Sequence, residues 1–176
     1  MKDEKLSFAG EVSIDEVTII TAKGLYQTVT NQVIGVEIYE DMFGGFITGQ
    51  VLFKESQDLL NLFPFIGQEF VKIELSTPTL PDEDKFKGEF FIYKMSQRFK
   101  IAGREMGYSL SFMSKEALVD MNKRISKTYK GKISETVQQL LTSEEGLEST
   151  KPTNIEETTN ATKHISNFWS PLKNIN

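Results

Sequence analysis

The sequence predicts a mainly β fold with short helices, in which an antiparallel β-barrel or β-sandwich is followed by the start of a small α+β domain. Two observations carry this expectation. Apolar and polar residues alternate at a period of two through most of the first two-thirds of the chain. The chain has 176 residues, 39% of them hydrophobic and 11% aromatic, which is enough to fill the core of one sizeable domain.

The first strand pattern lies near the start of the chain and changes phase in the middle. Val12 and Ile14 share one parity, whereas Val17 and Ile19 share the other. A strand keeps its apolar side chains on one face only if an extra residue is absorbed where the parity changes. We therefore expect a bulge or bend around Asp15-Glu16.

Three further segments have the alternation of half-buried antiparallel strands. Their apolar sets are Ile34, Val36 and Ile38 in residues 32–40; Ile47, Val51 and Phe53, with Gly49 in phase, in residues 47–54; and Val71, Ile73 and Leu75 in residues 69–76.

The last two strand patterns form an expected hairpin. Residues 86–99 are rich in aromatics and place apolar groups on both faces, and residues 106–112 return to clean alternation. Ala102-Gly103-Arg104 lies between them and is typical of a turn.

Three short helical patterns accompany the strands. They are a helix after Ser56 that carries Leu59, Leu60 and Phe63 and stops at Pro64; residues 115–122, with Ala117, Leu118 and Met121 on one side; and a helix after Ser134, with Ile133, Val137, Leu140 and Leu141 on one face.

A polar, basic segment without periodicity, residues 123–132, divides the chain. We expect a β domain over residues 1–128 and the start of a second, small domain over residues 129–176. Apolar residues return after His164 and reach almost to Asn176, so we expect the second domain to be incomplete and the natural protein to be longer.

Charge is unevenly distributed around the net value of −5. Residues 1–93 carry 7 basic and 16 acidic side chains, residues 94–132 carry 10 and 3, and residues 133–176 carry 3 and 6. A basic middle between acidic flanks is compatible with a phosphate-binding face. It is equally compatible with pairing against the acidic half of a neighbouring copy, and we favour solvated or inter-subunit charge over phosphate binding.

Composition excludes several kinds of site. The chain has no Cys and a single His, His164, so cysteine-ligated metals, multi-histidine zinc sites and thiol nucleophiles are impossible. The charged start lacks the apolar core of a signal peptide, and no apolar run is long enough to span a bilayer. We expect no cofactor, no metal and no membrane insertion.

Three readings of the polar residues remain to be weighed. The run Asp82-Glu83-Asp84 is interpreted as a solvated hairpin loop, and Glu40 with Asp41 as part of a turn beside Gly44-Gly45. The alternative is that Glu40 and Asp41 are the paired carboxylates of a cell-wall hydrolase, which would cleave a glycosidic bond. A further alternative is a single-stranded nucleic-acid binder that uses the basic middle and nearby aromatics, although core packing is the more common role of Phe.

The order of several segments resembles the first domain of baseplate hub proteins from contractile-tailed bacteriophages. The resemblance is carried by "VEIYEDMFGGFITGQVLFKESQDLLNLFPFIGQEFVKIEL" at Val36–Leu75, by "YKMSQRF", by "YSLSFMSKEALVDMNKRISKTYKGKISETVQQLL" and by "TKHISNFWSPLKNIN". It covers about residues 12–176. No piece is a catalytic signature, and the specificity comes from order and spacing over the whole chain.

The resemblance implies a structural virion protein with a tail-tube-like barrel. Such a protein forms a homotrimer, the baseplate hub, which joins the tail tube to the central spike, and its bore passes DNA as cargo during genome ejection. The implied partners are further copies of the chain, the tail tube protein, the central spike protein and other baseplate proteins. The implied location is the tail baseplate of the virion, assembled in the host cytoplasm, and no enzyme activity is expected.

A ring needs exposed edges and complementary charge at its subunit contacts. We therefore place the contact on the aromatic strand 86–99 and on the loop near residues 77–85. The candidate interface residues are Phe86, Phe90, Phe91, Tyr93, Asp82 and Asp84.

Overall fold

A computed structural model describes residues 10–55, 65–78, 81, 85–103 and 105–159, and the backbone of residues 161–165. The helix expected after Ser56, the acidic run 82–84, the side chain of His164 and residues 166–176 lie outside the described residues. The chain divides into two compact units, Met1–Ser114 and Lys115–Asn176. The domain boundary that we placed after residue 128 stays a prediction.

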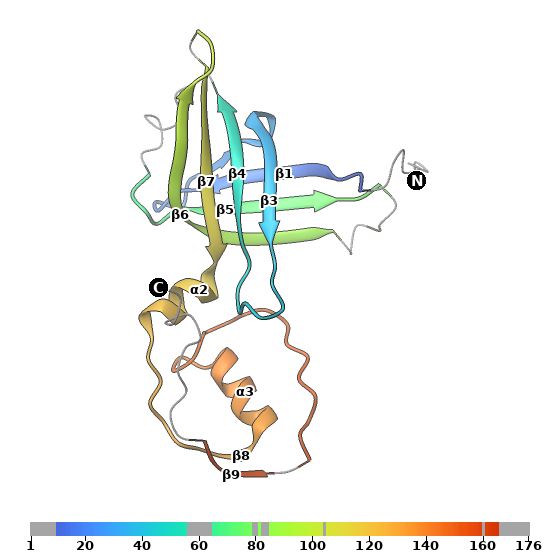
Figure 1. Ribbon diagram of the computed structural model, residues 1–176, viewed down its shortest axis with the longest axis vertical. Coiled ribbons are helices and arrows are strands. Elements are labelled where there is room, and N and C mark those ends of the chain that lie inside the picture. Colours follow the sequence, from blue (N-terminus) through green and yellow to red (C-terminus); the bar gives the residue numbers. More distant parts are fainter. Residues whose placement is uncertain are drawn as a thin grey trace. The chain divides into compact units, whose positions relative to one another are not determined.

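The first unit is one antiparallel sheet of seven strands (Figure 1). Its strands lie in the order β2-β1-β5-β6-β7-β4-β3, and this architecture confirms a mainly β fold with short helices. The strands are β1 (Ser13–Ile20), β2 (Tyr26–Thr28), β3 (Val33–Tyr39), β4 (Thr48–Glu55), β5 (Phe70–Ser76), β6 (Phe86–Lys100) and β7 (Met106–Ser114).

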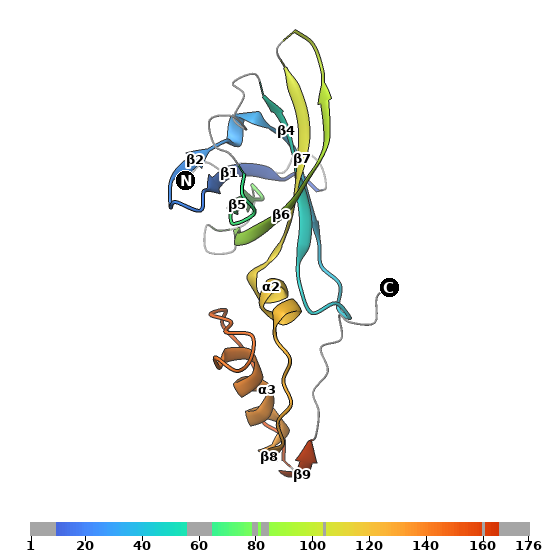
Figure 2. The same cartoon turned by 90° about the vertical axis from the view of Figure 1, so that its left-hand side faces the viewer.

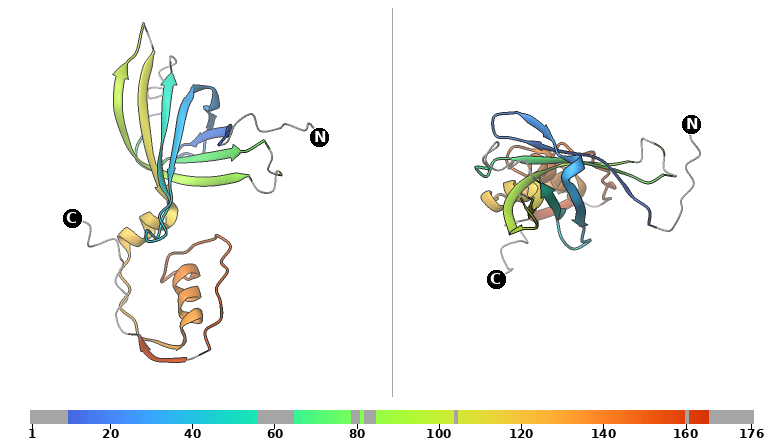
Figure 3. Two further views of the ribbon diagram at one scale, coloured as in Figure 1. Left: turned by 45° about the vertical axis from the view of Figure 1, so that its right-hand side comes forward. Right: turned by 90° about the horizontal axis from the view of Figure 1, so that it is seen from above.

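The sheet curls into a half-barrel (Figure 3). β2 and β3 stand at opposite ends of the strand order, yet the short 3-10 helix η1 (Thr30–Gln32) is almost all that joins them. A connection of this length requires the two ends of the sheet to approach each other. Two hydrogen bonds fix the connection to β1: Val29 donates its N–H to the Val17 carbonyl, and Val17 donates its N–H to Thr30 Oγ1, both at 2.8 Å.

The sheet changes direction along β6. Its first part, Phe86 to Phe91, pairs with β5, and the part from Phe90 to Lys100 pairs with β7. The pairing with β7 shifts register after Ile92 and again between Ser96 and Phe99. Bulges bend a strand and increase its twist, which accounts for the change of direction of β6 between its two halves (Figure 1).

The core lies inside this curl. It consists of the inward side chains of five strands and of the residue before η1: Val17, Ile19, Val29, Val51, Phe53, Val71, Ile73, Phe90, Ile92, Tyr108, Leu110 and Phe112. Aromatic contacts cross it, with ring centroids 4.7 Å apart for Phe90 and Phe112 and 5.4 Å apart for Phe53 and Tyr108. Burial of these side chains is the main stabilising contribution to the unit.

The bulge expected in the first strand is confirmed, because the pairing of β1 with β5 shifts register between Ile14 and Glu16. The face assigned to Ile34 was wrong. A second bulge between Val33 and Gly35 turns Ile34 outward, where it is 61% exposed, and Val33 packs against the core instead. The turn expected from Ala102 onward is also confirmed, since Glu105 donates its N–H to the Ala102 carbonyl at 2.8 Å.

The second unit contains two helices and a two-stranded sheet: α2 (Lys115–Asn122), α3 (Ile133–Thr142), β8 (Tyr129–Lys132) and β9 (Ala161–Ile165). α3 buries Leu140 as expected, but its other buried residues are Ser134 and Thr136. Ile133, expected on the buried face, is 42% exposed.

The segment after α3 is held by one lysine of the same unit. Lys123 Nζ donates to the backbone carbonyls of Glu144 and Gly146 and forms an ion pair with Glu148. Leu147 donates its N–H back to the Leu140 carbonyl at 2.8 Å, which satisfies a free carbonyl of the last helical turn.

Candidate functional site

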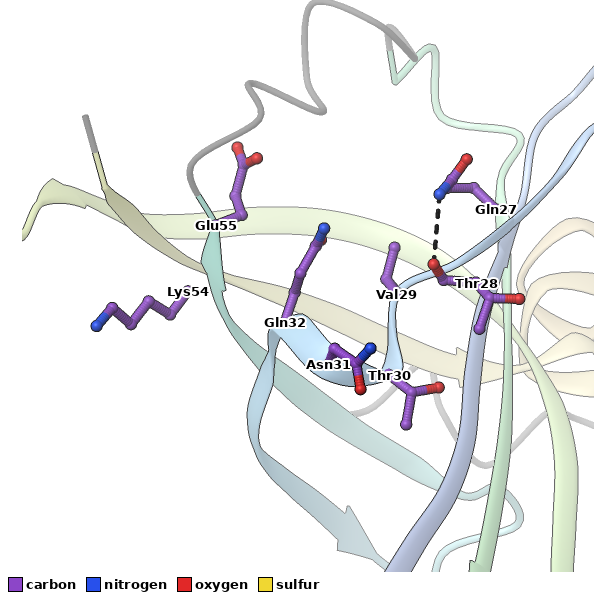
Figure 4. A pocket seen from close by; sticks show the side chains of 8 residues that line it. All are labelled: Gln27, Thr28, Val29, Thr30, Asn31, Gln32, Lys54 and Glu55. Carbon is purple, nitrogen blue, oxygen red and sulfur yellow. Dashed lines mark hydrogen bonds between the residues drawn. The ribbon is translucent and has the colours of Figure 1, made fainter.

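A polar pocket of about 440 Å³ lies where β2, η1 and the end of β4 meet (Figure 4). It is lined by Gln27, Thr28, Val29, Thr30, Asn31, Gln32, Lys54 and Glu55. Most lining side chains are therefore amides and hydroxyls. Figure 4 shows Lys54 pointing away from Gln32 and Glu55.

Unpaired polar atoms lie at and near this pocket. Gln32 Oε1 and the hydroxyl of Tyr108 are buried without a hydrogen-bond partner among the described residues. Burial raises the pKa of Tyr108, and the negative charge of Glu55 raises it further. The described residues contain no group of three His, Cys, Asp or Glu side chains that could hold a metal ion. The charged side chains of the lining, Lys54 and Glu55, are adjacent residues at the end of β4, and we assign no reaction to this pocket.

The carboxylates considered for catalysis, Glu40 and Asp41, lie in the hairpin loop between β3 and β4. Asp41 uses its carboxylate locally, because Oδ1 accepts the N–H of Phe43 at 2.9 Å. The same turn leaves Met42 and Phe43 exposed at 88% and 89%. This loop presents apolar side chains outward, and the pocket lining includes neither carboxylate.

β3 forms an acidic edge of the sheet, which we define as residues 33–41. Among the described residues β3 pairs with β4 alone, so its other side has no partner strand. Glu37 accepts hydrogen bonds from the Tyr39 hydroxyl at 2.5 Å and from Gln50 Nε2 at 2.6 Å. These two bonds, that from Tyr39 foremost, hold the pKa of Glu37 below its usual value, so the edge is negatively charged at neutral pH.

The second half of β6 forms a basic arm, which we define as residues 93–101. Register pairing of β6 with β5 ends at Phe91, and the hairpin of β6 and β7 reaches beyond the other strands (Figure 2). Its exposed residues combine three cations with large apolar side chains: Lys94, Arg98, Lys100, Tyr93, Met95, Phe99 and Ile101.

One cross-strand row connects the basic arm with the acidic edge. Lys94 lies opposite Ser111, Ser111 opposite Gln50, and Gln50 opposite Glu37. Residues in one row of a sheet point to the same face. Lys94 and Glu37 therefore stand at the two opposite edges of the β6-β7-β4-β3 part of the sheet, on one face.

The structure places the predicted interface residues in different environments. Phe90 is 3% exposed in the core, and Phe86 packs against that core. Phe91 is partly buried, with its ring centroid 5.7 Å from that of Phe70, and Tyr93 is 48% exposed. Asp82 and Asp84 lie outside the described residues. The interface itself stays a prediction.

Sequence reasoning did not single out β3 as an edge. The available signal was charge: from Val29 to Phe53 the sequence contains three acidic residues and no Lys, Arg or His. Alternation predicts that residues 32–40 form a strand, but it cannot tell an edge strand from a central one.

Comparisons with known proteins find similarity to solved structures but not to curated sequences. No protein-family model matches the chain, and no curated protein matches its sequence. A solved structure described as the Francisella PdpA-VgrG complex, half-lidded, matches with a TM-score of 0.41 and 11% sequence identity. The match covers 74% of this chain and 22% of the other. Within the described residues, no helix has the length and hydropathy needed to cross a membrane.

Proposed function

We propose that this chain is a structural subunit of a phage-tail-like baseplate hub, in which copies of the chain form a ring. The observation that supports this most directly is the curled sheet, in which β3 and the second half of β6 each lack a partner strand on one side among the described residues. Soluble proteins normally shorten, charge or cover such edges. Joining the free edges of neighbouring copies closes a ring and removes them.

The finer features of the proposal come from the family resemblance. The ring is a homotrimer that joins a tail tube to a central spike, surrounds a passage for DNA and belongs to the virion baseplate. Strand edges and loops make its subunit contacts, and it carries out no reaction. The resemblance of the segments in order over about residues 12–176 supports this, together with the mainly β fold.

The test is the mass of the chain in solution, measured by light scattering over a concentration series, combined with electron microscopy of negatively stained particles. A trimer that appears as a ring with a central opening supports the proposal. A dimer with two-fold symmetry contradicts it, because a two-fold contact uses the same patch on both copies and does not build a three-fold ring.

A further inference from the structure

We infer that neighbouring copies of this chain bind through two different surfaces, the acidic edge of one copy (residues 33–41) against the basic arm of the next (residues 93–101). The inference rests on the proposed ring and names the surfaces that close it. The occupant of each surface is a second copy of the chain, and the contact is the addition of one strand edge to another.

Both surfaces offer an unpaired backbone. Among the described residues, β3 is hydrogen-bonded to β4 on one side only, and the register of β6 with β5 ends at Phe91. Neither residues 33–41 nor residues 93–101 contain a proline, so the backbone N–H groups of both are able to donate. An edge of this kind is a template for another strand.

The two surfaces have opposite charge. The acidic edge carries Glu37, Glu40 and Asp41 and no basic residue, and the basic arm carries Lys94, Arg98 and Lys100 and no acidic residue. Two acidic edges repel each other, and so do two basic arms. Charge therefore disfavours a two-fold contact between identical surfaces and favours a head-to-tail contact between unlike ones.

The register inside one copy supports a continuous sheet. Lys94 and Glu37 end the same cross-strand row at opposite edges and on the same face. When the basic arm of one copy pairs with the acidic edge of the next without stagger, this row continues from Glu37 to the neighbour's Lys94. A stagger of two residues, as in barrels, keeps the same face and leaves the opposite charges near each other.

Exposed apolar side chains accompany the charges on both surfaces. Tyr93, Met95 and Phe99 of the basic arm are 48%, 39% and 52% exposed, and Ile34 and Tyr39 of the acidic edge are 61% and 56% exposed. Large apolar groups with charges around them are typical of a protein interface. Pairing the two edges buries these groups and places the charges at the rim.

The experiment uses charge reversal in the whole chain. The arm variant is K94E/K100E, and the edge variant is E37K/E40K. Their matched controls carry the same charge changes on exposed residues of the second unit, K115E/K130E and E144K/E156K. Self-association is measured by analytical ultracentrifugation at low and moderate salt, with circular dichroism to confirm folding.

We expect each interface variant to weaken self-association about tenfold or more, because like charges then face each other. Both controls retain the affinity of the wild-type chain. In an equimolar mixture, the arm variant and the edge variant bind each other again, because the acidic arm of one fits the basic edge of the other. A ring of three still contains one contact between two copies of the same variant, so self-association is restored in part. Only a contact between two different surfaces restores binding in this way.

Three outcomes overturn the inference. If the wild-type chain associates and both interface variants associate equally well, the contact lies elsewhere and the proposed ring survives. If the arm variant loses affinity for a fluorescent single-stranded oligonucleotide but keeps its self-association, the basic arm is a nucleic-acid surface. If the wild-type chain remains monomeric at millimolar concentration, both the inference and the proposed ring fail.

Hydrogen exchange gives a second readout that does not depend on any variant. Raising the concentration of the wild-type chain should slow amide exchange in residues 33–39 and 93–100, since unpaired edge amides gain partners. Slowing confined to other strands contradicts the inference even if the chain trimerises.

Discussion

The ring of Phe112 on β7 lies over Gly49 on the neighbouring strand β4. A methyl group placed on Gly49 would come within 2.4 Å of the Phe112 ring and within 2.2 Å of the Glu37 carbonyl. Gly49 lies on the same inward face of β4 as Val51 and Phe53 but has no side chain to pack there. The ring of Phe112 from the adjacent strand occupies that space.

We expect Gly49→Ala to lower the free energy of unfolding by about 2 kcal/mol or more, because neither the ring nor the carbonyl has space to move. Gly45→Ala is the control, since a Cβ at Gly45 meets nothing within 4 Å. Urea unfolding monitored by circular dichroism measures the unfolding free energy of both variants. Equal stability of the two would contradict the close contact of Phe112 with Gly49.

Glu69 holds the turn before β5. Its carboxylate, in a residue only 2% exposed, accepts the backbone N–H groups of Ile66, Gly67 and Gln68 at 2.8, 2.9 and 3.1 Å. Glu69→Ala leaves these donors without an acceptor, and we expect a loss of about 3 kcal/mol in unfolding free energy. Glu89→Ala, at an exposed position, should change it by less than about 0.5 kcal/mol. Thermal unfolding of both variants checks this.

Tyr108 combines a stacked ring with a hydroxyl that has no hydrogen-bond partner in the described part of the chain. Tyr108→Phe keeps the stacking on Phe53 and removes a buried polar atom, so we expect unchanged or slightly higher stability at neutral pH. Tyr108→Ala, which also removes the ring, should cost about 4 kcal/mol. A loss of more than about 1 kcal/mol in the Phe variant would indicate that the hydroxyl has a partner.

The burial of Tyr108 also predicts that stability falls at alkaline pH. The pKa of Tyr108 is raised in the folded chain, chiefly by burial. Below about pH 10 the hydroxyl is neutral in both states. Above that pH the unfolded chain ionises first, so stability falls as pH rises toward the folded-state pKa. Unfolding free energies measured across this range should fall less steeply for Tyr108→Phe than for the wild-type chain.

The contacts of Glu116 predict that the stability of the second unit falls at acid pH. Burial raises its pKa, but hydrogen bonds from its own backbone, from Lys151 Nζ at 3.0 Å and from Ser149 Oγ at 2.8 Å outweigh burial and lower it. Its stabilising contribution is therefore present above about pH 4.3, the usual pKa of Glu, and is lost as pH falls through the lowered pKa. Glu116→Gln should cost about 1 kcal/mol at neutral pH and show a flatter acid limb. Chemical denaturation over a pH series measures both, and an acid limb as steep as that of the wild-type chain would contradict this role.

Much of the fold could be predicted from local patterns. Period-two alternation gave the six long strands, the parity change gave the bulge between Ile14 and Glu16, and the helix pattern gave α2 with the observed bounds Lys115–Asn122. β2 was missed because a strand of three residues has no measurable period. Ile34 was misplaced because nothing in its own side chain marks a bulge.

The candidate surfaces were only partly predictable. The exposed Tyr93 lies on the basic arm, as the aromatic strand suggested, whereas the buried Phe90 is part of the core. Both are aromatic residues of the same strand. The local sequence does not indicate which of them packs into the core inside the curled sheet. The acidic edge was visible as a charge bias and acquired a meaning only when β3 was found at the end of the strand order.

By itself, the sequence determined the kinds of elements, their approximate bounds, the uneven charge and the absence of cysteine chemistry. These properties follow from side chains that lie near each other along the chain. Only the tertiary structure decided which strands are edges, how the sheet curls and that Lys94 and Glu37 end one row. The reason is physical: strand order and register are fixed by pairing and packing between residues far apart in sequence, and alternation within one strand carries no information about its neighbours.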